Sequence, residues 1–205
     1  MLPITLSDAW TTFRYFLRCM AATVEEPAKL AARLYVQAHQ RNDILLWLLP
    51  LERLARLLLL AEAAAITLSP TAPRRRGPRK EVKGSRLRPV PEESEEWRVA
   101  FKAAAGAKRR SKRAARAARR TFAATVHDAV PLAARIEALI RVALDPAPYA
   151  KRLARRLSKR PLSRKQARRL FRPANLETPL GRPFEHALPG FMALAAPARF
   201  RFESG

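Results

Sequence analysis

The side chains that usually carry catalysis or bind metals are few and scattered in this chain of 205 residues. The three histidines, His39, His127 and His186, have no second histidine or cysteine at metal-ligand spacing. His127 and Asp128 are adjacent, but neighbouring residues on a helix point in different directions. The sequence also has no glycine-rich phosphate loop. We therefore expect a protein that is not an enzyme and that holds no metal and no cofactor.

The chemistry that the sequence does offer is electrostatic. The net charge is +24, and the stretch KRRSKRAARAARR at residues 108–120 holds eight basic residues and four alanines. On a helix, all of these basic residues except Arg110 fall within an arc of about 140°. They are Lys108, Arg109, Lys112, Arg113, Arg116, Arg119 and Arg120. Residues 102–127 contain no acid, so an anion such as a phosphate backbone would relieve the repulsion, with release of counterions.

A long helix must position this stripe, and we expect one over residues 92–125, about 50 Å in length. It would begin near Pro91, with four glutamates in its first turns, where the helix dipole favours acids. Two interpretations remain open. The stripe contacts a polyanion, or it is a solvated helix face in a protein whose 32 arginines and 9 lysines reflect a GC-rich genome.

A second basic region covers residues 151–172, with eleven basic groups and no acid. Apolar spacing predicts one short helix marked by Tyr149, Leu153 and Leu157. A capping box of Ser163 and Gln166 predicts the start of a second. The candidate phosphate contacts on these helices are Lys151, Arg152, Arg155, Arg156, Arg168 and Arg169. Basic amphipathic helices also bind anionic membrane surfaces, but few large apolar residues are available here, which favours nucleic acid.

Residues 69–91 are expected to form a linker, since they contain five prolines and two glycines. The cluster Arg74, Arg75 and Arg76 either contacts phosphates or belongs to a solvated spacer. Charge is distributed unevenly around this linker. Residues 1–68 carry seven basic and six acidic groups, whereas residues 92–205 carry 26 and ten. This asymmetry indicates a neutral packing unit joined to a basic one.

The neutral unit, residues 1–68, is predicted to be helical from its apolar spacing. Ser7 or Asp8 is a candidate cap for its first helix, and Thr23 with Glu26 has capping-box spacing for a second. Asn42 and Asp43 are expected to interrupt the chain before the leucine-rich segment 44–68, which Pro50 divides.

The leucine-rich segment 44–68 is not expected to span a membrane, because its four charged residues cost more than its apolar residues gain. It is therefore either the centre of a bundle, which we favour, or a surface covered by a protein partner or a membrane. The candidate partner-binding residues are Trp47, Leu58, Leu59 and Leu60.

The remaining segments are a packing helix and a tail. Leu132, Ile136, Leu139, Ile140 and Ala143 lie on one helix face, which ends at Asp145-Pro146. Residues 173–205 contain five prolines and are expected to form an irregular strap. Its phenylalanines would pack on the bundle or on a partner. They are Phe184, Phe191, Phe200 and Phe202.

Together these patterns predict an all-α protein: a small helical bundle with a long basic helix, a proline-rich linker and an irregular C-terminal tail. Its units would be residues 1–68, 69–91, 92–172 and 173–205. A single cysteine and an N-terminus without signal-peptide features indicate a cytoplasmic location. The expected function is charge-driven, sequence-nonspecific contact with nucleic acid. The alternative is a helical adaptor or scaffold that binds a protein or a membrane surface through residues 44–68.

Overall fold

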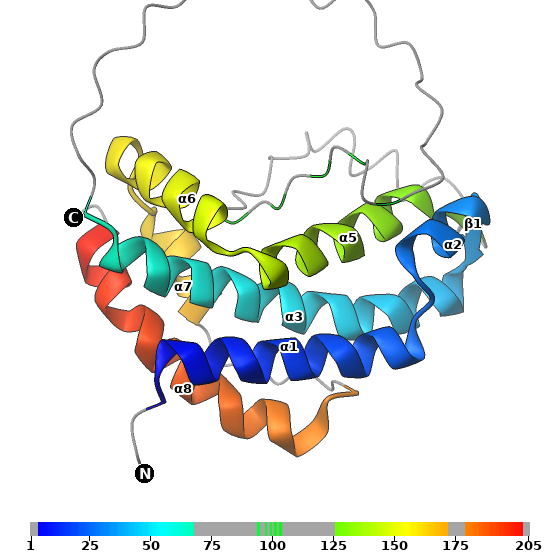
Figure 1. Ribbon diagram of the computed structural model, residues 1–205, viewed down its shortest axis with the longest axis horizontal. Coiled ribbons are helices and arrows are strands. Elements are labelled where there is room, and N and C mark those ends of the chain that lie inside the picture. Colours follow the sequence, from blue (N-terminus) through cyan, green and yellow to red (C-terminus); the bar gives the residue numbers. More distant parts are fainter. Residues whose placement is uncertain are drawn as a thin grey trace, which may run out of the picture.

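The computed structural model describes residues 4–67, 94, 97, 99, 101, 103, 126–171 and 179–202, without the side chains of Lys165, Arg169 and Phe200. In these residues the chain is mostly helical, with one two-stranded sheet (Figure 1). This confirms the all-α prediction. The helices are α1 Leu6–Thr23, α2 Pro27–Ala32, α3 Ala38–Ala65, α5 Val130–Leu144, α6 Ala147–Lys159, α7 Arg164–Phe171 and α8 Gly181–Phe202.

Helix α1 begins with a capping box, but not at the predicted residue. Thr5 is the N-cap: its hydroxyl accepts a hydrogen bond from the Asp8 amide at 3.2 Å, and the Asp8 carboxylate accepts one from the Thr5 amide at 3.3 Å. The second predicted box is wrong, because the Thr23 hydroxyl donates to the Cys19 carbonyl inside α1. Helix α2 starts with Pro27 in its first turn, as expected, and has no side-chain cap.

A short sheet joins α2 to a distant part of the chain. Strand β1, Tyr35–Gln37, pairs antiparallel with β2, Val126–Asp128, so that Val36 lies opposite His127. Leu34 precedes β1 with a φ of 61°, a left-handed conformation that is uncommon for a side chain of this size. Its carbonyl accepts a hydrogen bond from the Ala129 amide at 2.8 Å. Three-residue strands were missed in the sequence because they are too short to show alternation.

Helix α3 is the centre of the bundle. It packs against α1, α5, α6 and α8 (Figure 1). The predicted interruption at Asn42–Asp43 and the division at Pro50 are both wrong, since the helix is continuous from Ala38 to Ala65. Proline inside a helix costs about 3 kcal/mol. Burial of the surrounding leucines outweighs that cost, because Leu48, Leu51 and Leu54 are all fully buried.

The C-terminal residues 181–202 are a helix rather than the predicted irregular strap. Helix α8 carries an apolar stripe at spacings of three and four residues that is buried against α3 and α1. The stripe consists of Phe184, Leu188, Phe191, Ala195, Ala198 and Phe202. Its burial keeps α8 helical despite Pro189 and Pro197. The expectation that these phenylalanines pack on the bundle is confirmed for Phe184, Phe191 and Phe202.

One hydrophobic core contains residues from every described helix except α7, and the partly buried Phe171 of α7 packs against it. Helices α1 and α3 from the predicted N-terminal unit, and α5 and α6 from the predicted basic unit, therefore bury their apolar faces together. Helix α5 matches its predicted face: Leu132, Ile136 and Leu139 are buried, and the helix ends before Asp145.

Candidate polyanion-binding surface

The predicted stripe at residues 108–120 and the cluster Arg74–Arg76 lie outside the described residues. Of the predicted helix 92–125, the structure describes Ser94, Trp97, Val99, Phe101 and Ala103, and none of these is in an α-helix. The predicted start of that helix near Pro91 is therefore wrong.

The described part of that segment is held on the core by backbone and side-chain contacts. Arg141 of α5 donates to the Trp97 and Ser94 carbonyls, each at 2.6 Å, and the Trp97 side chain is buried. The Arg56 guanidinium lies 5.6 Å from the centre of the Phe101 ring. After the stripe, residues 126–128 form strand β2 instead of the end of a helix. The described residues that precede and follow residues 104–125 in the sequence are therefore anchored on the bundle.

Helix α6 has two faces, as predicted. Ala150, Leu153, Ala154 and Leu157 are buried. At 100° per residue, its basic side chains occupy an opposite arc of about 140°. These are Lys151, Arg152, Arg155, Arg156 and Lys159, and each is exposed.

Helix α7 continues this surface. The predicted capping box is confirmed: the Ser163 amide donates to the Gln166 side-chain oxygen at 3.0 Å, and the Gln166 amide donates to the Ser163 hydroxyl at 3.4 Å. The preceding loop is fixed to α8, because the Leu162 amide donates to the Phe202 carbonyl at 2.7 Å. Arg164 and Arg168 are exposed, whereas the side chain of the predicted contact Arg169 lies outside the described part.

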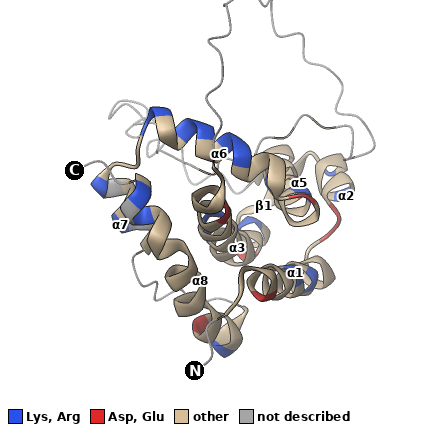
Figure 2. Ribbon diagram, turned by 60° about the vertical axis from the view of Figure 1, so that its left-hand side comes forward, with Lys and Arg blue, Asp and Glu red and all other residues tan. Residues whose placement is uncertain are grey.

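We call the exposed cations of α6, α7 and the loop between them the basic corner. It comprises Lys151, Arg152, Arg155, Arg156, Lys159, Arg160, Arg164 and Arg168. Residues 146–176 contain no acid, and no carboxylate among the described residues forms an ion pair with the basic corner. Figure 2 shows basic residues on the outer sides of α6 and α7. Lys159, Arg160 and Arg164 were missed as candidates, although Lys159 continues the i, i+4 spacing of the α6 cations.

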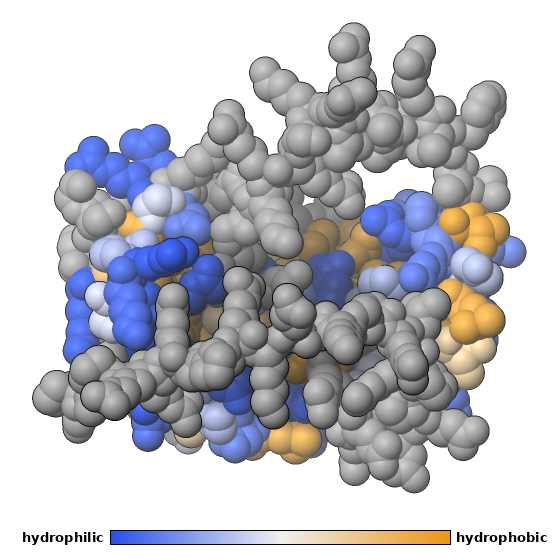
Figure 3. Space-filling model, turned by 90° about the horizontal axis from the view of Figure 1, so that it is seen from above, coloured by the Kyte–Doolittle hydropathy of each residue, from blue (hydrophilic) through white to orange (hydrophobic). Residues whose placement is uncertain are grey.

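Hydrophilic and hydrophobic surface lie at opposite ends of the molecule. Figure 3 looks onto the α6 side and shows hydrophilic residues gathered at the end where α6 lies. More hydrophobic surface appears at the opposite end, near β1, where Leu34, Tyr35 and Val126 are exposed. The described cations of the basic corner therefore occupy one end of the bundle.

Other arginines have a structural role that distinguishes them from the basic corner. Three of them donate to backbone carbonyls at the C-terminal ends of helices: Arg14 to Ala143 of α5, Arg53 to Leu170 of α7, and Arg201 to Ala64 of α3. The last carbonyls of a helix have no partner within the helix, and a cation there also matches the helix dipole. The arginine excess of the sequence thus includes residues that the fold itself requires.

Two buried glutamates accept hydrogen bonds from further arginines. Glu52 of α3 accepts from Arg56 and from Arg135 of α5, each at 2.7 Å, and Glu137 accepts from Arg141 at 2.7 Å. Burial alone would raise the pKa of Glu52, but the hydrogen bond and charge of Arg135, with those of Arg56, outweigh burial and lower it. The Glu52–Arg135 ion pair joins α3 to α5, whereas the Glu52–Arg56 pair lies within α3 and the Glu137–Arg141 pair lies within α5.

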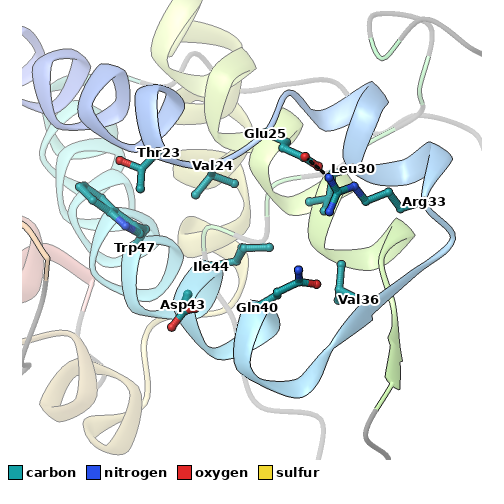
Figure 4. Close-up of a pocket in the computed structure, with 10 residues that line it drawn as sticks. All are labelled: Thr23, Val24, Glu25, Leu30, Arg33, Val36, Gln40, Asp43, Ile44 and Trp47. Atoms are coloured by element: carbon teal, nitrogen blue, oxygen red, sulfur yellow. Dashed lines mark hydrogen bonds and ion pairs between the residues drawn. The ribbon is translucent and has the colours of Figure 1, made fainter.

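The predicted partner-binding residues lie in two different environments at different positions along α3. Leu58, Leu59 and Leu60 are at most 2% exposed, so they cannot present a surface to a partner. Their assignment as partner-binding residues is wrong, and the favoured alternative, the centre of a bundle, is the one observed. The reason is that α3 is covered by neighbouring helices on several sides. Trp47 is half-buried, and it lines a cavity at the other end of α3 (Figure 4).

No described helix is long and apolar enough to cross a membrane, as predicted for residues 44–68. No group of three or more metal-ligating side chains was found among the described residues. Comparisons with protein-family models, with curated proteins and with solved structures give no match for this chain.

Proposed function

We propose that this protein is not an enzyme and binds nucleic acid through its phosphate backbone, without preference for base sequence. The supporting observation is the basic corner: eight exposed cations without a carboxylate partner in the described part of the chain. Cations placed on a solvated helix are usually interspersed with acids, because ion pairs at i, i+4 stabilise the helix. An all-cationic face is stabilised when an external anion takes the place of those acids.

The charge density of α6 is somewhat lower than that of a nucleic-acid duplex but of the same order. From Lys151 to Lys159 the helix rises about 12 Å. A duplex carries about seven phosphate charges over that length. Five exposed cations of α6 lie within this span. Each cation that neutralises a phosphate releases condensed counterions, and this release favours binding at low salt. The same mechanism predicts weak discrimination between sequences, because phosphates carry no base information.

A pair of matched variants tests the proposal. In the basic-corner variant, Lys151, Arg152, Arg155 and Arg156 are changed to glutamine. In the control variant, one lysine and three arginines from other faces are changed in the same way: Arg18, Lys29, Arg41 and Arg182. Both variants have a net charge lower by four, so a difference between them reports the position of the charge and not its amount.

We expect the basic-corner variant to bind labelled duplex DNA and single-stranded RNA more weakly than the control variant does. Fluorescence anisotropy at low salt measures both affinities, and comparison of the two probes shows which nucleic acid is preferred. Urea unfolding checks that both variants remain folded. Equal affinities of two folded variants would show that the basic corner is not the binding surface.

A further inference from the structure

A cavity of about 230 Å³ lies at the end of the bundle away from the basic corner. It is formed by the end of α1, α2, β1 and the first turns of α3 (Figure 4). Its apolar wall consists of Val24, Leu30, Val36, Ile44 and Trp47. An apolar cavity of about 150 Å³ is enough for benzene, so this cavity has room for a ring with a substituent.

Two hydrogen-bond donors face this apolar wall. Gln40 and Arg33 reach toward the cavity from α3 and from the end of α2 (Figure 4). The Gln40 side-chain oxygen is occupied by the Gln37 amide at 3.2 Å, as part of the cap of α3. This bond fixes the orientation of the side chain and leaves its NH₂ group as a donor. The Arg33 guanidinium has five N–H groups, of which its contact with Glu25 uses only a part.

The charges around the cavity favour a neutral acceptor over an anion. Glu25 forms an ion pair with Arg33 and neutralises its charge. Asp43 adds a negative charge to the rim, although its side chain points away from Gln40 and Arg33 (Figure 4). A carboxylate ligand would meet both acids, while a carbonyl oxygen would accept the same hydrogen bonds without that repulsion.

We propose that this cavity binds an uncharged, largely apolar small molecule that carries a carbonyl or amide oxygen. Its ring packs against the Trp47 indole and the aliphatic side chains of the wall. Its oxygen accepts hydrogen bonds from the Gln40 NH₂ group and from Arg33. This site is separate from the basic corner, and its ligand does not depend on binding of nucleic acid.

Benzamide is the probe that tests this proposal, with benzoate and benzylamine as matched charged analogues. The readout is the Trp47 indole N–H resonance in a two-dimensional NMR spectrum, assigned with the W47F variant. Trp10 and Trp97 are buried, so their resonances serve as internal references. A ligand of this size, at about 0.3–0.5 kcal/mol per atom, binds with a dissociation constant of about 0.5–10 mM. We expect saturable shifts with benzamide and weaker binding of both charged analogues.

The Gln40→Glu variant removes the proposed hydrogen bond to the ligand while it keeps the cap of α3. Glutamate keeps the oxygen that caps α3 and suits the first turn of a helix, but it removes the donor. We expect benzamide to bind about fivefold more weakly to this variant, which is the loss of one hydrogen bond of about 1 kcal/mol. The proposal is overturned if benzamide does not shift the Trp47 resonance, if a charged analogue binds as well, or if Gln40→Glu leaves the affinity unchanged.

Discussion

Glu52 is the residue whose substitution tests the packing of the bundle most sharply. It is 7% exposed and accepts hydrogen bonds from Arg135 and Arg56. Substitution by glutamine keeps the shape of the side chain but removes its charge. The two guanidinium groups then face an amide, and part of their charge is left without compensation inside the protein.

The expected loss in the free energy of unfolding follows from the burial of Glu52, Arg135 and Arg56. Removing one member of a buried ion pair costs about 3–5 kcal/mol. The Arg135 and Arg56 side chains retain 36% and 20% exposure, so water still solvates them in part. We therefore expect the lower end of this range, about 3 kcal/mol. This is a large part of the 5–15 kcal/mol by which proteins of this kind are stable.

Urea unfolding of Glu52→Gln measures this loss as a lower midpoint with an unchanged slope. The pH dependence gives a second test. The pKa of Glu52 in the folded protein lies below its ordinary value of 4.5. Its charge therefore stabilises the fold fully above pH 4.5, and this contribution is lost as the pH falls through the folded pKa. We expect the difference between the wild type and Glu52→Gln to shrink on acidification over that interval.

A double-mutant cycle that combines Glu52→Gln with Arg135→Gln measures the interaction between Glu52 and Arg135. Once Glu52 has been replaced, the loss of Arg135 should cost less, with a coupling free energy of about 0.5–3 kcal/mol. Two results would refute the reasoning. One is a Glu52→Gln variant within about 0.5 kcal/mol of the wild type, and the other is strict additivity of the two substitutions.

Two further substitutions test other parts of the bundle. Burial raises the pKa of Glu62, against the lowering effects of its hydrogen bond from Trp10 and of the Arg14 charge. The charged form of Glu62 therefore opposes folding, so Glu62→Gln should raise the urea midpoint at pH 7. This gain in stability should disappear as the pH falls through the pKa of Glu62 in the folded protein. An unchanged urea midpoint at pH 7 would contradict this prediction. Phe184 is 1% exposed and lies 6.2 Å from the Phe16 ring centre. Phe184→Ala should lower the free energy of unfolding by about 3–5 kcal/mol, and a loss below about 1 kcal/mol would show that α8 contributes little to the core.

Local signals in the sequence predicted the elements whose boundaries depend on local contacts. The Ser163–Gln166 capping box, the apolar face of α5 and the two faces of α6 are all present. Each signal involves residues within about four positions of one another, so it does not depend on the rest of the fold.

Elements that depend on tertiary packing were predicted less well. Pro50 indicates a break on local grounds, but α3 is continuous because it is packed on several sides. Pro189 and Pro197 likewise suggested an irregular tail. The signal for α8 was present in the spacing of Phe184, Leu188 and Phe191. That spacing alone did not show that α1 and α3 pack against this face and keep it helical.

The candidate site was predicted in part. The sequence identified the cations of α6 from their spacing, because an amphipathic helix places its charged face outward. It could not separate exposed arginines from those that cap helices, such as Arg14, Arg53 and Arg201, since those contacts join residues more than 100 positions apart. The cavity beside Trp47 was missed for a different reason: its residues are close in the sequence, but its wall forms only when four separate elements pack together.

The salt dependence of nucleic-acid binding tests the central claim most directly. The logarithm of the affinity for duplex DNA should fall linearly with the logarithm of the salt concentration. Removal of four phosphate contacts from the basic corner should reduce this slope by up to about 3.6. The control variant, with the same net charge, should keep a slope close to that of the wild type. Equal slopes for the basic-corner and control variants, or no binding at the lowest salt, would contradict the account.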